Sequence, residues 1–201
     1  MSTATPSLSR GMTIEEWADL DEDEPGELVD GQLEEEEMPT YVHETVVRWL
    51  LVRLSNWVEP LGGETFGSEG KLIVSQRRGR KADVSVYLPG RALPAGNLSA
   101  TRRPPSIAIE VLSPRPRDVR RDRIDKAAEY AAFGVTYYWI VDPLGRTLEV
   151  RELHADGRHV SLLEASEGMH AVPGCEGLVL DLDALWVNVD KASAREDEDE
   201  G

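Results

Sequence analysis

Hydrophobic residues recur at helical spacing between residues 40 and 58. The residues that share this spacing are Val42, Val46, Trp49, Leu50, Leu54 and Trp57. Steps of three and four positions place them on one stripe of a helix, which Pro60 ends. A second helix is predicted over residues 118–133, because Gly134 is a typical C-terminal cap. A short helix is also expected after Thr13.

Shorter hydrophobic stretches predict the strands. Residues 27–29 and 32–34 form a hairpin, since Asp30-Gly31 suits the positive φ angles of a tight turn. Further strands are expected at residues 63–66, 71–75, 81–88, 106–113, 137–141, 147–153 and 160–163, and a closing segment at 178–186. The core order is helix, three strands, helix, strand. It predicts an α/β fold in which one helix crosses from the third strand to the fourth.

Two acids occupy positions where these strands should be apolar. In residues 81–88 the alternation puts Ala82 and Val84 on one face and Asp83 on the other, beside Lys81. Glu110 interrupts the otherwise apolar strand 106–113. A buried carboxylate is costly unless a cation or hydrogen-bond donors meet it. Glu110 is therefore expected to have a charged or hydrogen-bonding partner.

Lys126 is a candidate for that partner. At 100° per residue it shares a stripe of the second helix with Asp122, Tyr130 and Phe133. The same helix has a separate face of small residues, and either face could pack on the sheet. If the aromatic stripe turns inward, Lys126 approaches the acids. If it does not, Asp122 and Lys126 form an ordinary surface pair.

Two acids and a lysine on neighbouring elements suit metal-assisted phosphodiester hydrolysis. Mg²⁺ prefers one or two carboxylates together with carbonyl and water oxygens, so Asp83, Glu110 and the carbonyl of Val111 are the candidate ligands for Mg²⁺ or Mn²⁺. Lys126 would then orient the attacking water and offset the developing charge. The sequence has no zinc pattern and no phosphate-binding glycine loop.

Charge is distributed unevenly along the 201 residues, whose net charge is −16. Residues 11–47 contain many acids and no Lys or Arg, whereas Lys and Arg predominate over residues 71–126. The basic zone could bind a polyanion, with Lys81 and Arg121 as candidate substrate-binding residues, or its arginines could simply lie in solvated loops. We expect DNA as the partner in the first case.

The chain ends and the composition set the remaining expectations. We expect a flexible segment at residues 1–10, a single domain at 11–190 and an acidic disordered tail at 191–201. Cys175 is the sole cysteine, which excludes a disulfide scaffold. No signal peptide or membrane span is recognisable, so a cytoplasmic protein without a membrane partner is expected.

Several segments together carry a resemblance. GELVDG (26–31), His43, ADVSVYL (82–88), IEVLSP (109–114), DRIDKAAEY (122–130) and GVTYYWIVDP (134–143) resemble, in order and spacing, the bacterial Uma family of restriction endonucleases within the PD-(D/E)XK nucleases. The resemblance implies a restriction-endonuclease-like fold, a divalent metal at Asp83 and Glu110, and DNA as substrate.

The sequence departs from the nuclease signature at two positions. Ala82 replaces its proline, and Leu112 replaces the lysine expected two residues after Glu110. In the family a helix lysine looks like a migrated replacement, which here is Lys126. Asp122 is a possible accessory residue.

Two other residues are possible accessories of the site. Glu27 either reaches the metal or is an exposed strand residue, the favoured interpretation. His43 either contacts phosphate or metal, or is a structural residue at a helix start.

The predicted activity is thus metal-dependent DNA endonuclease activity. The alternative is a catalytically weak DNA-binding or protein-interaction module that keeps the nuclease fold. We also expect a homodimer, because Trp49 and Trp57 share a stripe and small nucleases often pair to cut two strands.

Overall fold

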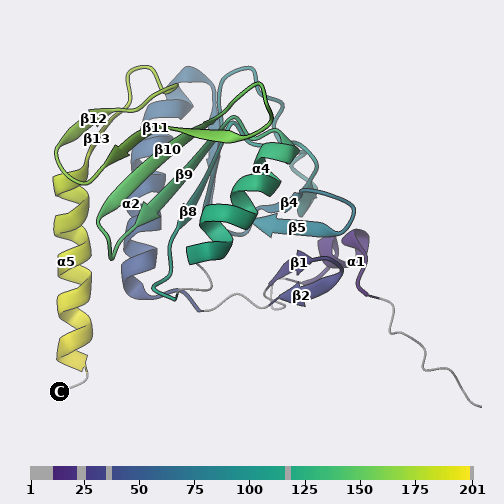
Figure 1. The fold of residues 1–201 in the computed structure, drawn as a ribbon, viewed down its shortest axis with the longest axis horizontal. Helices are drawn as coiled ribbons and strands as arrows, with labels where there is room; N and C mark the ends of the chain where they lie inside the picture. Colours follow the sequence, from purple (N-terminus) through teal and green to yellow (C-terminus); the bar gives the residue numbers. More distant parts are fainter. Residues whose placement is uncertain (1–10, 22–25, 35–37, 116–118, 200–201) are drawn as a thin grey trace, which may run out of the picture.

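A six-stranded mixed sheet forms the centre of the molecule (Figure 1). The computed structural model describes residues 11–21, 26–34, 38–115 and 119–199. The strand order is β11-β10-β9-β8-β6-β3, and the strands are β3 (Glu64–Phe66), β6 (Val84–Tyr87), β8 (Ile107–Val111), β9 (Tyr137–Asp142), β10 (Thr147–Leu153) and β11 (His159–Ala165). Strands β8 and β9 are parallel, and a helical segment crosses between them. The predicted α/β core with one crossover helix is confirmed.

Helices cover both faces of this sheet (Figure 1). Helix α2 (Tyr41–Val58) begins at the N-cap Thr40, as its spacing predicts, and buries Val46, Leu50 and Leu54 against β6 and β8. On the other face lie the π-helical turn η2 (Arg121–Lys126) and helix α4 (Ala127–Phe133). The start of α2 and the end of β8 lie toward the lower end in Figure 1. Contacts of His43 with Asp83 and of Lys126 with Glu110 bring side chains from both layers to this part of the sheet.

A second sheet has the order β2-β1-β5-β4-β7. Its strands are β1 (Glu27–Val29), β2 (Gln32–Glu34), β4 (Lys71–Ile73), β5 (Arg78–Lys81) and β7 (Ala100–Thr101). The predicted hairpin is present, with positive φ at Asp30 and Gly31. Helix α1 (Ile14–Ala18) packs on this sheet, and the buried Trp17 lies directly over Gly79.

The prediction of one continuous strand over residues 81–88 is wrong. The chain bends at Ala82 and Asp83, and this bend passes it from the second sheet to the first. Ala82 therefore packs in a different apolar cluster from Val84 and Val86, with which the alternation grouped it. The bend also places Asp83 immediately before Val84, the first residue of β6. Its side chain therefore does not have to follow the alternation of the strand.

The C-terminal region is more regular than its composition indicates. Strand β12 (Met169–Ala171) pairs with β13 (Val179–Asp181). The remaining short element, the 310-helix η1 (Glu59–Leu61), lies outside this region and directly follows α2. The expected closing segment is β13 and the start of helix α5 (Leu182–Asp199). Helix α5 extends past residue 191, and its buried residues, the last of which is Ala192, lie on the side that packs beside α2. The acidic disordered tail expected at 191–201 stays a prediction. The segment 1–10 lies outside the described residues. None of the described helices is long and apolar enough to cross a membrane.

The two tryptophans that motivated the homodimer prediction are used within the chain. Trp49 is buried in the core, and the indole N–H of Trp57 donates to the carbonyl of Glu176 at 3.0 Å. The homodimer stays a prediction, and its interface would have to involve a surface other than Trp49.

Candidate active site

Asp83 connects helix α2 to the last residue of strand β8. Its Oδ2 accepts a hydrogen bond from the backbone N–H of Val111 at 2.6 Å. The Nε2 of His43, in the first turn of α2, lies 3.3 Å from the same oxygen. Burial alone would lower the pKa of His43, but the hydrogen bond and charge of Asp83 outweigh it and raise the pKa. His43 is thus placed to orient Asp83.

Glu110 has the buried partners that its position in β8 demands. Its Oε2 lies 2.9 Å from the Nζ of Lys126, and its Oε1 accepts a hydrogen bond from the Tyr130 hydroxyl at 2.8 Å. Burial raises the pKa of Glu110 well above its usual value, and the ammonium of Lys126 offsets this only in part. The aromatic stripe of the second helix therefore faces the sheet, as one of the two predicted packings required.

Lys126 is surrounded by acids. Besides Glu110, its Nζ lies 3.2 Å from Oε1 of Glu27 and 3.7 Å from Oδ1 of Asp122. All four side chains are almost fully buried, so the alternative of a solvated surface pair is wrong. Burial also raises the pKa of Asp122. Two further cations meet these acids, since Arg80 contacts Glu27 and Arg121 contacts Asp122.

Glu27 is buried, which contradicts the favoured interpretation of an exposed strand residue. Its Oε1 accepts from the backbone N–H of Lys81 at 2.9 Å, and its Oε2 accepts from Nη1 of Arg80 at 2.7 Å. Burial would raise the pKa of Glu27, but Lys126 and Arg80 lower it below the usual value. Glu27 therefore joins the hairpin to the acids of the central sheet.

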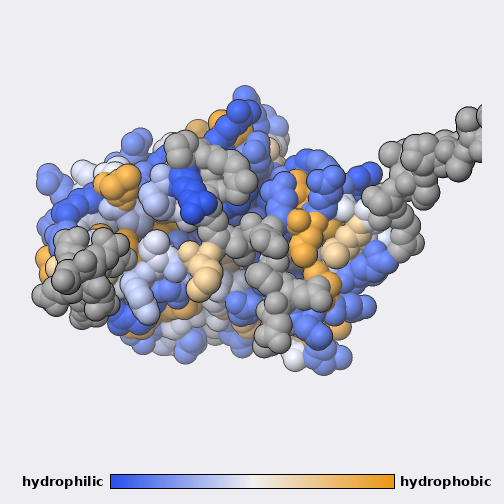
Figure 2. Space-filling model, turned by 90° about the horizontal axis from the view of Figure 1, so that it is seen from below, coloured by the Kyte–Doolittle hydropathy of each residue, from blue (hydrophilic) through white to orange (hydrophobic). Residues whose placement is uncertain are grey.

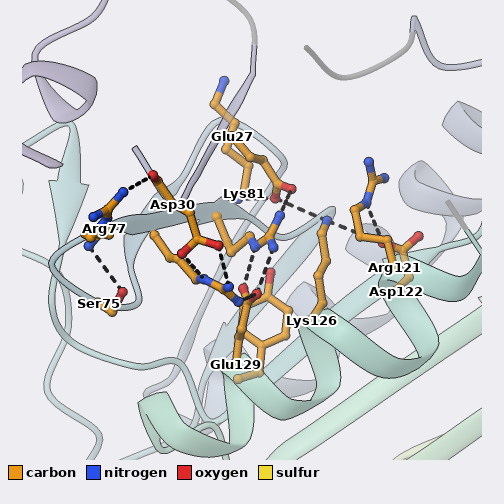
Figure 3. A network of polar contacts seen from close by, with 12 residues as sticks. Glu27, Asp30, Ser75, Arg77, Lys81, Arg121, Asp122, Lys126 and Glu129 are labelled. Carbon is orange, nitrogen blue, oxygen red and sulfur yellow. Dashed lines mark hydrogen bonds and ion pairs between the residues drawn. The ribbon is translucent and has the colours of Figure 1, made fainter. Parts of the chain in front are cut away.

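The sequence analysis missed Arg80, which is only 2% exposed. Its guanidinium binds Glu129 of α4 through two hydrogen bonds of 2.6 and 2.9 Å, besides the one to Glu27. Arg78 contacts Glu129 as well and also binds Asp30 in the hairpin turn (Figure 3). Arg78 and Arg80 share one face of β5, and this alternation of two arginines was the signal available in the sequence.

The predicted substrate-binding residues lie beside the acids. Lys81 is largely buried, and its Nζ lies 3.4 Å from a carboxylate oxygen of Glu69. Arg121 is half-buried, and its Nε donates to Oδ1 of Asp122 at 3.2 Å (Figure 3). The Arg121 side chain therefore borders the acidic cluster, whereas Lys81 contacts it only through its backbone N–H, which donates to Glu27.

The candidate metal position has two carboxylates, those of Asp83 and Glu110, which suit a hard divalent cation. The described residues contain no group of three or more His, Cys, Asp and Glu side chains arranged around a metal position. Asp83 and Glu110 are on neighbouring strands, each adjacent to the registered pair Val84 and Ile109. A carboxylate oxygen has two lone pairs; Oε2 of Glu110 accepts a hydrogen bond from Lys126, and Oε1 accepts one from Tyr130. Mg²⁺ accepts two carboxylates completed by carbonyl and water oxygens.

Comparisons with known proteins agree with this architecture. A crystal structure described as a putative nuclease belonging to DUF820 from Anabaena variabilis has 19% sequence identity and a TM-score of 0.70. The match covers 89% of this chain and 99% of that chain, and it shows a shared fold. No curated protein matches the sequence.

The family comparison covers the whole site. The model of the Uma2 family, described as "Putative restriction endonuclease", matches residues 13–186, a range that contains Glu27, Asp83, Glu110 and Lys126. The fold, the order of the motifs and this match lead to one conclusion: the chain belongs to the Uma2 family of restriction-endonuclease-like nucleases.

Proposed function

We propose that the protein is a metal-dependent DNA endonuclease that hydrolyses phosphodiester bonds. The observation that carries the proposal is the buried contact of 2.9 Å between Lys126 and Glu110, on a strand next to Asp83. Leu112, which replaces the signature lysine, is buried in the apolar cluster under α4. Lys126 supplies from the helix the ammonium that Leu112 cannot.

Asp83, Glu110 and the carbonyl of Val111 would hold the metal, Mg²⁺ or Mn²⁺. When bound, such an ion polarises a phosphoryl oxygen and lowers the pKa of a coordinated water. The protein's own groups do the rest. His43 and the N–H of Val111 fix the Asp83 carboxylate, and Lys126 stabilises negative charge that develops on the phosphoryl group.

DNA is proposed as the substrate because cations border the acidic site although the whole chain is acidic. The guanidinium of Arg121 contacts Asp122 of the cluster, and Lys81 contacts Glu27 through its backbone N–H. Both residues belong to the segment 71–126, in which Lys and Arg predominate. Figure 2 views the lower end of the molecule, and its coloured surface is largely hydrophilic, with hydrophobic residues in small separate groups. Such a surface suits a polar, charged ligand.

One observation favours the second candidate, a catalytically weak binding module. Both oxygens of Glu110 are already engaged, by Lys126 and by Tyr130, so the cluster could serve as a structural network. Metal binding separates the two functions, because a structural network has no need for a divalent cation.

The experiment measures the thermal stability of the protein with and without Mg²⁺ or Mn²⁺. A ligand that binds the folded state at a hundred times its dissociation constant stabilises by about 2.7 kcal/mol. We expect stabilisation of the wild type, and a much smaller effect in Asp83→Asn and Glu110→Gln. Asp125→Asn is the matched control, since Asp125 is exposed on the same helical turn as Lys126. Equal metal responses in all four proteins would exclude a shared site at Asp83 and Glu110.

A further inference from the structure

A cavity lies between the two sheets, near the strand that follows Asp83. Its volume is about 260 Å³, and strands β3, β4, β6 and β7 and the segment 94–99 line it. The rings of Phe66 and Tyr87 meet edge to face in its wall, with centroids 5.6 Å apart. Leu98 is 61% exposed and also lines the cavity, which places it at the mouth. A pocket of this size suits a small ring system, since drug-sized ligands occupy roughly 300 Å³ or more.

One buried polar group in the cavity has no partner. The Oγ of Ser85 makes no hydrogen bond within the described part of the chain, and the residue is 3% exposed. The neighbouring hydroxyl of Tyr87, by contrast, donates to the carbonyl of Arg103 at 3.0 Å. A buried hydroxyl without a partner is unfavourable, and native proteins rarely keep one without reason. The Ser85 hydroxyl therefore indicates a ligand with a polar edge.

The cavity is connected to the candidate active site by two elements. Ser85 is the second residue of β6 and follows Asp83 by two residues. In extended backbone this corresponds to about 6 to 7 Å between the two Cα atoms. Lys71 lines the cavity and is paired in register with Lys81, which precedes Asp83 by two residues. The ammonium of Lys71 donates to the carbonyls of Trp17, Ala18 and Leu20, and that of Lys81 contacts Glu69. The carboxylate of Glu64, which is exposed, also lines the cavity.

We propose that this cavity binds a single nucleobase, which belongs to an unpaired nucleotide next to the phosphodiester bond at Asp83 and Glu110. The proposal rests on the endonuclease function proposed above. The aromatic wall suits the flat face of a base, and the Ser85 hydroxyl can donate to or accept from its polar edge. The substrate class is then DNA with a single-stranded or extrahelical nucleotide.

The test measures binding, without divalent metal, of a single-stranded oligonucleotide that contains one 2-aminopurine. Its fluorescence reports stacking of the base, and an oligonucleotide with an abasic site at that position measures the contribution of the base. We expect Ser85→Ala to weaken the base-dependent part of binding roughly three- to tenfold, as the loss of one hydrogen bond does. Because the hydroxyl has no protein partner, the melting temperature of this variant should be unchanged or higher. Ser161→Ala, on the exposed edge strand β11, is the matched control.

Phe66→Leu gives a second, independent variant, and it should weaken stacking of the base and its fluorescence change. Equal affinity of the wild type for the 2-aminopurine and the abasic strand would overturn the proposal, as would unchanged base-dependent binding in both variants. Free 2-aminopurine riboside is the comparison ligand. Binding of the riboside but not of the strand would overturn the assignment to DNA and leave a free nucleoside as the ligand.

The outcome is separable from that of the endonuclease proposal, because the assay requires no cleavage. A protein that binds the base in a Ser85-dependent manner and does not cleave DNA refutes the activity alone. A protein that cleaves DNA and binds both strands equally refutes the nucleobase cavity alone.

Discussion

Replacement of Lys126 by methionine removes the ammonium that Glu110, Glu27 and Asp122 share. The methionine side chain is similar in length, so little volume is lost and the main effect is electrostatic. Removal of one partner from a buried ion pair costs about 3–5 kcal/mol, because a charge is left without compensation. All these side chains are at most 4% exposed, so solvent screens them little. We therefore expect a loss of about 3–5 kcal/mol in the free energy of unfolding at neutral pH.

This loss should depend on pH with a definite sign. The folded-state pKa of Glu110 is raised above its unfolded value, mainly by burial, so the folded state binds more protons than the unfolded state between the two pKa values. Stability from this group is therefore present at low pH and is lost as the pH rises through the folded pKa. Without Lys126 the carboxyl pKa values rise further. The deficit of the variant should be largest near about pH 7.5 and smaller near about pH 5.

Urea unfolding at the two pH values measures this difference from the midpoints, provided that the m-value is unchanged. Lys191→Met is the matched control, because Lys191 is exposed on α5 and should contribute within about 0.5 kcal/mol. The double variant Glu110→Gln/Lys126→Met should recover part of the loss, since it removes one uncompensated carboxylate. If Lys126→Met proved as stable as Lys191→Met at about pH 7.5, the inferred charge cluster would be refuted.

Two further predictions test the packing. Gly79→Ala should lower the melting temperature, because its Cβ would lie 2.2 Å from the ring of Trp17, and overpacking typically costs about 1–3 kcal/mol. Gly67→Ala should have little effect, because its added Cβ would lie 3.8 Å from its nearest neighbour, the side chain of Leu51. Equal melting temperatures of the two variants would contradict the packing. Burial raises the pKa of Cys175 to about 12, so a thiol reagent at about pH 8 should label the folded protein far more slowly than the urea-unfolded chain. Equal labelling rates would show that the thiol is accessible.

Periodicity predicts the parts of the fold in which one element faces one core. The stripe of α2 meets this condition and is present where it was expected. Strand β8 was predictable for another reason: it is buried on both faces, so it reads as a nearly unbroken apolar run. The strand predicted at 81–88 fails because Ala82 and Val84 belong to different cores, which alternation along one strand cannot reveal. The extent of helix α5 could not be predicted from local pattern, because its packing beside α2 joins segments that lie far apart in the sequence.

The residues of the candidate site also fall into two groups, those that the sequence predicts and those that it does not. Asp83, Glu110 and Lys126 could be predicted because each conflicts with its local apolar pattern. The burial of Glu27 could not, because it depends on Arg80, which reaches it from another strand of the second sheet. The π-helical turn at residues 121–126, which carries Lys126, is also invisible in the sequence, and such turns are frequent at functional sites.

Nicking of supercoiled plasmid in the presence of Mn²⁺ tests the central claim, that Asp83, Glu110 and Lys126 form an endonuclease site. The wild type and Lys191→Met should nick at equal rates. Asp83→Asn and Lys126→Met should be slower by two orders of magnitude or more, at a temperature at which circular dichroism shows them folded. Lys81→Met, included beside them, should bind DNA more weakly but keep its chemistry. Full activity in Lys126→Met would contradict the migrated lysine, and no activity in any of the proteins would favour the non-catalytic module.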